Sequence, residues 1–146
     1  MYISDEDAFG YWVFQNPDVV KDFKDSLPSG ISEQLDYSVN SLDVLETWLT
    51  ENFNTVDEIT SFVNVSVLDG SARYVGRVFL ANLGGKWGID IHNKDNMYHS
   101  LPVIESKVGV TCPLSVVSTS IDRRTGHFIS DVLRAKMKRL PADLTA

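Results

Sequence analysis

Residues 67–91, VLDGSARYVGRVFLANLGGKWGIDI, contain the change of hydrophobic period that decides the fold. Apolar residues between positions 67 and 83 recur at the spacing of a helix, and the Gly84-Gly85 pair follows where such a helix is expected to end. Alternate residues then become apolar, as in a half-buried strand, at Trp87, Ile89 and Ile91. The segment therefore predicts a long helix that passes through a glycine turn into a strand.

The glycines within and after this helix have structural explanations. Gly76 lies in the middle of the helix, where glycine is less favourable than alanine by about 1 kcal/mol, so we expect another element to cross closely there. A phosphate-binding loop places its glycines before a helix, where free N–H groups and the positive end of the dipole meet the anion. Gly84 and Gly85 follow the helix instead, and they predict a helix stop and a tight turn.

The N-terminal side of the chain is predicted to be mainly helical. Residues 8–14 are densely aromatic and fit either a short helix or a strand. Three amphipathic helices are expected after them, at residues 18–27, 41–53 and 55–63, with N-caps at Asn16, Ser41 and Thr55.

The C-terminal side is predicted to begin with strands and to return to helix. Residues 97–101 and 103–110 favour one or two further strands, followed by helices near 114–121 and, capped by Thr125, up to residue 137. This order predicts an α+β fold with N-terminal helices, a small antiparallel sheet at about residues 86–110 and C-terminal helices. We expect residues 1–146 to form a single domain, in which residues 1–40 could be an extension particular to this protein.

Composition sets limits on location and chemistry. The 146 residues are 43% hydrophobic and 23% charged, as in a folded globular domain. No stretch approaches the ~20 apolar residues that span a bilayer, and the acidic N-terminus does not resemble a secretory signal. One cysteine cannot form an internal disulfide, and no cluster has metal-ligand spacing. We therefore expect a soluble, cytoplasmic protein without membrane contact, metal or cofactor.

The formal net charge of −7 is distributed unevenly. Residues 1–70 contain 14 Asp and Glu against 2 Lys and Arg, whereas residues 71–146 contain 6 against 11. If the two halves present separate faces, the acidic one repels nucleic acid and attracts a basic protein partner, chiefly by speeding association. If the halves fold against each other, part of the charge pairs internally and the rest serves solubility.

No catalytic constellation is evident. Cys112 has histidines as candidate bases, but its apolar neighbours predict a buried, unreactive thiol. His92 and His99 flank a predicted turn without the spacing of a zinc site. Arg123 and Arg124 could grip a phosphate or carboxylate, or could occupy an exposed turn between two helices. We predict that the protein is not an enzyme; an enzyme of unrecognised type that uses Cys112 or His92 is the alternative.

Two motifs carry a resemblance to known proteins: Tyr74-Val75-Gly76 within the central helix and Leu83-Gly84-Gly85-Lys86-Trp87 at its end. With residues 112–114 and 122–126, they resemble a pattern in small uncharacterised bacterial domains, some of which are similar to immunity proteins of polymorphic toxin systems. The resemblance spans about residues 42–135 and defines no catalytic residues. It implies a protein that binds and inhibits a protein partner, with a cognate toxin as the expected partner.

These observations lead to the hypothesis that an acidic, aromatic-bearing surface occludes a basic partner. Tyr and Trp dominate interface energetics, so exposed aromatic residues among the acids are candidate anchors. The candidate contact residues are Tyr11, Trp12, Asp18, Asp22, Asp25, Asp36 and Tyr37. Trp48 is a further candidate, for which core packing is the competing explanation. Two alternatives stay open: a regulator that binds a small molecule or nucleotide through Arg123 and Arg124, and a subunit of a larger bacterial assembly.

Overall fold

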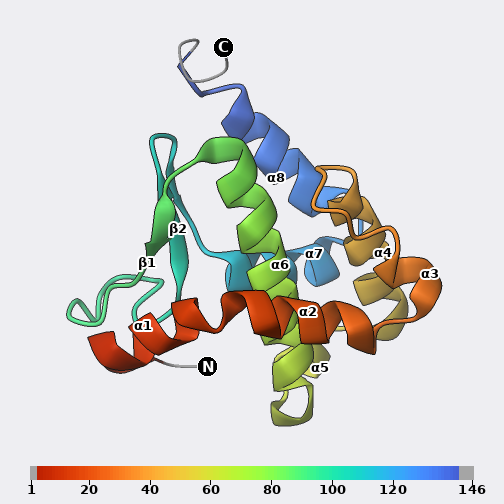
Figure 1. The fold of residues 1–146 in the computed structure, drawn as a ribbon, viewed down its shortest axis with the longest axis horizontal. Helices are drawn as coiled ribbons and strands as arrows, with labels where there is room; N and C mark the ends of the chain where they lie inside the picture. Colours follow the sequence, from red (N-terminus) through yellow and green to blue (C-terminus); the bar gives the residue numbers. More distant parts are fainter. Residues whose placement is uncertain (1–2, 142–146) are drawn as a thin grey trace.

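Helix α6 (Val65–Leu83) runs through the centre of the molecule, and the other elements pack around it (Figure 1). The computed structural model describes residues 3–141. Before α6 lie α1 (Glu6–Phe14), α2 (Asn16–Ser26), α3 (Ser29–Ser32), α4 (Ser41–Asn52), α5 (Val56–Ile59) and the 3-10 helix η1 (Phe62–Asn64). After it follow β1 (Lys86–Gly88), β2 (Val103–Ser106), β3 (Gly109–Thr111), α7 (Pro113–Arg123) and α8 (Phe128–Met137). The predicted α+β fold, in which helices precede and follow a small sheet along the chain, is confirmed.

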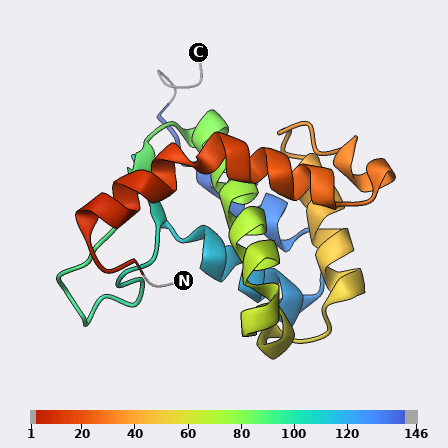
Figure 2. The same cartoon turned by 60° about the horizontal axis from the view of Figure 1, so that its bottom comes forward.

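The apolar side chains of α6 form the middle of the core. Its fully buried residues include Tyr74, Val75, Val78 and Phe79. Helix α2 crosses α6 on one side and α7 packs against the other, as two views show (Figure 1 and Figure 2). The same core contains Val20, Phe23, Leu27 and Leu35, so α2 and the segment after it pack together with the rest of the described residues. No helix within residues 3–141 has both the length and the apolar character needed to cross a bilayer.

The three strands form an antiparallel sheet in the order β1-β2-β3, beside α6 (Figure 1). Trp87 of β1 is paired with Ile104 of β2. The chain can turn directly from α6 into β1 because Gly84 and Gly85 have φ angles of +72° and +95°, which favour glycine. The glycine stop predicted for this helix and the small antiparallel sheet are therefore confirmed.

Gly76 provides the close crossing that its position in the middle of α6 predicts. A Cβ atom at Gly76 would lie 2.2 Å from Cη2 of Trp87, so the Trp87 indole occupies the space of the missing side chain. The indole of Trp12 meets Trp87 edge-on, with ring centroids 4.8 Å apart. The Tyr-x-Gly and Gly-Gly-x-Trp motifs are thus the two sides of one contact between α6 and β1, and α1 packs against it.

The strands are shorter than predicted. β1 ends at Gly88 rather than Ile91, and residues 97–101 form turns and a bend instead of a strand. The Asp90 carboxylate accepts hydrogen bonds from the backbone N–H of Asn93, the Asn96 side chain and the backbone N–H of His92, and these bonds lower its pKa to about 2. Such a side-chain-centred turn competes with strand pairing, and the alternation of apolar residues does not reveal it.

Three predicted N-caps are wrong, and one is confirmed. Helices α2 and α4 begin at Asn16 and Ser41 themselves, and these side chains bond to α6, to Arg73 and Tyr74 respectively. Helix α8 begins only at Phe128, so Thr125 lies outside it. Thr55 caps α5 as predicted, since its hydroxyl accepts the N–H of Glu58. At Asn16 and Ser41 the side chain bonds to a residue of α6 that is distant along the chain, and the local sequence does not reveal such a partner.

The helix predicted over residues 55–63 is interrupted after Ile59. The hydroxyls of Thr60 and Ser61 donate to the carbonyl oxygens of Val56 and Glu58, and Ser61, in an extended conformation, precedes the separate 3-10 helix η1. Phe62 and Val63 consequently point away from the core, with 90% and 85% of their surface exposed.

Replacement of Gly76 by alanine is expected to lower the free energy of unfolding by about 1–3 kcal/mol, because the added methyl group must displace Trp87 from a packed core. Urea denaturation measures the effect. Gly10→Ala is the matched control: no atom lies within 4 Å of a Cβ there, and alanine should stabilise α1 by about 0.5–1 kcal/mol. The Gly76→Ala penalty should shrink in a Trp87→Leu background, and an equal penalty in both backgrounds would contradict the contact.

Candidate functional site

A buried polar cluster joins α1 and α2 to α6 around Arg73. Arg73 is 4% exposed, and its guanidinium donates to the Asp69 carboxylate at 2.8 Å, the Trp12 carbonyl oxygen at 2.7 Å and the Asn16 side-chain oxygen at 2.9 Å. The guanidinium carbon also lies 4.0 Å from the centroid of the Trp12 ring. The indole N–H of Trp12 donates to Asp69 in turn. This cluster pairs its buried charge internally and holds the N-terminal helices in place.

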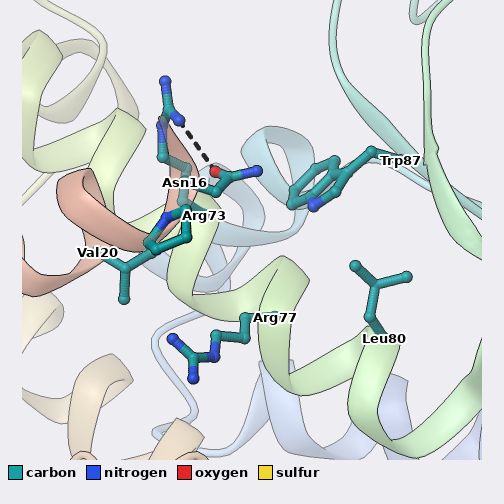
Figure 3. Close-up of a pocket in the computed structure, with 7 residues that line it drawn as sticks. Asn16, Val20, Arg73, Arg77, Leu80 and Trp87 are labelled. Atoms are coloured by element: carbon teal, nitrogen blue, oxygen red, sulfur yellow. Dashed lines mark hydrogen bonds between the residues drawn. The ribbon is translucent and has the colours of Figure 1, made fainter. Parts of the chain in front are cut away.

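A pocket of about 240 Å³ opens beside this cluster (Figure 3). Its lining consists of Asn16, Pro17, Val20, Arg73, Arg77, Leu80 and Trp87. Figure 3 shows the Asn16 oxygen turned toward Arg73 and its amide nitrogen turned toward Trp87, whose ring nitrogen faces the open space near Leu80. The Arg77 guanidinium lies at the other end of the pocket. The walls are thus largely apolar, and polar groups lie around them.

Two cations gather on Tyr37 next to this pocket. The Arg77 guanidinium lies 3.9 Å and the Lys24 ammonium 4.7 Å from the centroid of the Tyr37 ring. Tyr37 is held firmly, since its ring stacks on Tyr74 and its backbone N–H donates to the Tyr74 hydroxyl at 2.9 Å. Among residues 3–141, no salt bridge links Arg77 or Lys24 to a carboxylate. The positive charge at this position is therefore not locally compensated by an ion pair.

The exposed side of α2 is acidic. Asp18, Asp22 and Asp25 follow one another at intervals of four and three residues, so they share one face, and all three are exposed. Asp25 forms an exposed salt bridge with Lys21. Asp36, also exposed, lies beyond α3, where hydrogen bonds from Ser38 lower the pKa of its carboxyl. The structure brings Asp18, Asp22 and Asp25 together on one face of α2 and places Asp36 in the segment after α3.

The predicted aromatic anchors have different environments. Tyr11 is 62% exposed, but Trp12 is buried between Arg73 and Trp87 and is not available to a partner. Tyr37 is half-buried. Trp48 is half-buried as well, and it packs edge-on against Phe53.

The exposed apolar side chains of η1 were missed in the sequence, because Phe62 and Val63 fit the apolar face of a continuous helix. A groove of about 260 Å³ lies nearby, between α2 and the start of α6. Its lining consists of Val19, Asp22, Phe23, Ser26, Ser66 and Val67. Val65, at the first turn of α6, is also exposed. The exposed residues of η1 and Val65 thus come directly before the part of α6 that shares this groove with Asp22 of α2. In the sequence, only Thr60 and Ser61, whose hydroxyls bond to the backbone at the end of α5, could have indicated this exposure.

The acidic helix α5 and a group of lysines lie at opposite ends of α6. Figure 1 shows α5 near the N-terminal end of α6, and the β2–β3 turn and the last turn of α8 near its C-terminal end, while α2 crosses α6 between them. That second end contains Lys107, Lys136 and Lys138. The salt bridges among the described residues all join residues four apart, so the acidic half is not neutralised by contacts with the distant basic end.

Arg123 and Arg124 turn to different neighbours. Arg124 ends α7 in a left-handed conformation, and its guanidinium donates to the carbonyl oxygens of Thr50, Phe53 and Asn54 at the end of α4. A cation there complements the negative end of the helix dipole. Arg123 is exposed, with its guanidinium 6.0 Å from the Phe128 ring. The two side chains do not form a joint anion grip.

The candidate catalytic residues are not gathered into one site. Cys112 is buried as predicted, and this burial raises the pKa of its thiol, which disfavours the reactive thiolate. His92 is exposed in the turn around Asp90. The described residues contain no group of three or more His, Cys, Asp or Glu that could hold a metal ion.

Arg124→Ala should lower the free energy of unfolding by about 1–3 kcal/mol, because the carbonyl groups at the end of α4 lose charged donors. Arg123→Ala should change it by less than about 0.5 kcal/mol, since an exposed residue without hydrogen bonds is replaced. Both variants keep a non-glycine residue at position 124, so backbone strain is matched. Equal stability of the two variants in thermal denaturation would contradict the assigned role of Arg124.

Three features of the described residues thus stand out: the acidic face of α2 with its groove against the start of α6, the pocket next to Arg73, and the cations on Tyr37. Each is built from side chains of two or more elements that meet at α6. No family model, curated protein or solved structure matches this chain.

Proposed function

We propose that this protein is a non-enzymatic binding protein that covers a basic site on a protein partner, in the manner of an immunity protein. The observation that carries the proposal is the exposure of two apolar side chains of η1, Phe62 and Val63, shortly before the part of α6 that forms a groove with the acidic helix α2. We call this area the α2–η1 surface and define it by Asp18, Asp22, Asp25, Phe62, Val63 and Val65.

The apolar part of the α2–η1 surface supplies binding energy. A phenylalanine or valine side chain gains about 1.5–3 kcal/mol when it moves from water into a protein contact. Phe62 is 90% exposed, so nearly all of that gain is available to a partner. The groove between α2 and the start of α6, which is lined in part by Val67 and Phe23, could accept an apolar side chain from the partner in return.

The acidic part supplies attraction and selectivity. Three carboxylates on one face of α2 favour a basic surface and speed the encounter with it. They disfavour nucleic acid, and they also disfavour a second copy of this chain, because a symmetric contact would place like charges together. A partner of different sequence, with basic residues around an apolar recess, fits the surface better. A cognate toxin, as the resemblance implies, meets that description when its own site is basic.

The proposal can be tested by quantitative affinity capture from the native host at low salt, followed by binding measurements with the purified captured protein. Phe62→Ser is expected to weaken binding by about thirtyfold, the effect of losing a central interface anchor of ~2 kcal/mol. Asp18→Asn with Asp22→Asn should slow association and reduce its dependence on salt.

Val110→Ser is the matched control, because Val110 is 53% exposed in β3 and lies outside the α2–η1 surface. It should bind like the unaltered chain. Equal affinity of the Phe62→Ser variant and the control, or the absence of any protein retained by the unaltered chain, would refute the proposal. Retention of only this chain itself would show self-association instead.

A further inference from the structure

We infer that the pocket between α2, α6 and Trp87 binds a small carboxylate with a flat apolar body, such as an aromatic acid. This site is separate from the α2–η1 surface and uses none of the residues that define it. The inference depends on three independent features of the pocket: the Arg77 cation at one end, the donors without partners among the described residues, and the apolar walls.

The cation in the wall of the pocket is Arg77, and a second cation, Lys24, lies outside the lining; both lie over Tyr37. Since their charged groups are 3.9 Å and 4.7 Å from one ring centroid, they cannot be more than about 9 Å apart. The ring attracts both cations, but it leaves their hydrogen-bond donors free. Asp36 lies near enough to Lys24 for the ammonium to contribute to its lowered pKa, yet no salt bridge forms between them. A carboxylate would bind the planar Arg77 guanidinium through two parallel hydrogen bonds.

The other polar groups that face the pocket are also donors. The Asn16 oxygen is occupied by Arg73, whereas its amide N–H groups donate to no residue among 3–141. The ring N–H of Trp87 likewise has no acceptor in the described part of the chain, and Figure 3 shows the nitrogen on the pocket side. Arg73 itself is neutralised by Asp69. A lining that offers donors and no free acceptor selects a ligand that accepts hydrogen bonds.

The walls explain why the ligand needs an apolar body. Pro17, Val20 and Leu80 contribute aliphatic surface, and Trp87 contributes an indole held in place by its contact with Gly76 and Trp12. A flat ring would pack well against such a surface. The volume of about 240 Å³ lies just below the usual range for ligand pockets, about 300–1,000 Å³, so the ligand must be small.

The test uses benzoate as the probe, added to ¹⁵N-labelled full-length protein. Two reporters are followed by NMR, the indole N–H of Trp87 and the side-chain amide of Asn16, each assigned through its own variant. Benzoate should shift both signals saturably, with a Kd of about 1 mM or tighter. Benzyl alcohol, which has the same ring without the charge, should bind at least about tenfold more weakly. Inorganic phosphate, which has charge without a ring, should give no saturable shift.

Arg77→Gln should weaken benzoate binding by about tenfold or more, because the guanidinium is lost while the polar surface is kept. Arg123→Gln, at an exposed arginine outside the pocket, should leave it unchanged. If the NMR signals of residues outside the pocket are the same in the Arg77→Gln variant as in the unaltered protein, the variant is folded. The inference fails if benzoate causes no saturable shift, if benzyl alcohol binds as well, if phosphate binds as tightly, or if Arg77→Gln has no effect.

Discussion

The buried guanidinium of Arg73 is the interaction on which the arrangement of the molecule depends. A charge that is 4% exposed is costly unless its hydrogen bonds are satisfied, and here Asp69, Trp12 and Asn16 satisfy them. Two of these partners belong to the N-terminal helices. The requirement to pair Arg73 therefore fixes α1 and α2 across α6 at one position, where apolar packing alone would allow several.

Both candidate sites follow from that position. With α2 fixed, Asp18 and Asp22 are exposed, and Asp22 shares a groove with Ser66 and Val67, which follow the exposed η1 in the chain. The α2–η1 surface depends on that arrangement. The same crossing places Asn16 and Val20 opposite Arg77, Leu80 and Trp87, which encloses the pocket. The close contact of Trp87 with Gly76 fixes the remaining wall. The α2–η1 surface and the pocket thus both depend on the position of α2 on α6.

Local sequence reading predicts the parts of this structure that depend on local rules. The apolar spacing of residues 67–83 and the glycine pair after it predict α6 and its end, and the cost of glycine at position 76 predicts a close crossing. Long-range partners cause the errors. Ser41 is a residue type that often caps helices, but its hydroxyl bonds to Tyr74. Asp90 lies in a segment of alternating apolar and polar residues, but its carboxylate forms a turn. Trp12 is a residue type that often anchors interfaces, yet it is buried against Arg73. Because Arg73 is 61 residues further along the chain, the local sequence does not reveal this contact. The pocket combines α2, α6 and β1, which no local pattern relates to one another.

Hydrogen exchange of the Arg73→Met variant tests this account most directly. If Arg73 holds the N-terminal helices, backbone amides in α1 and the first turns of α2 should lose protection by about a hundredfold or more, the effect of breaking a buried charge pair worth ~3 kcal/mol. Amides of α7 and α8, which pack on α6 elsewhere, should keep most of theirs. Unchanged protection in α1 and α2, or an equal loss in all helices, would contradict the central role assigned to Arg73.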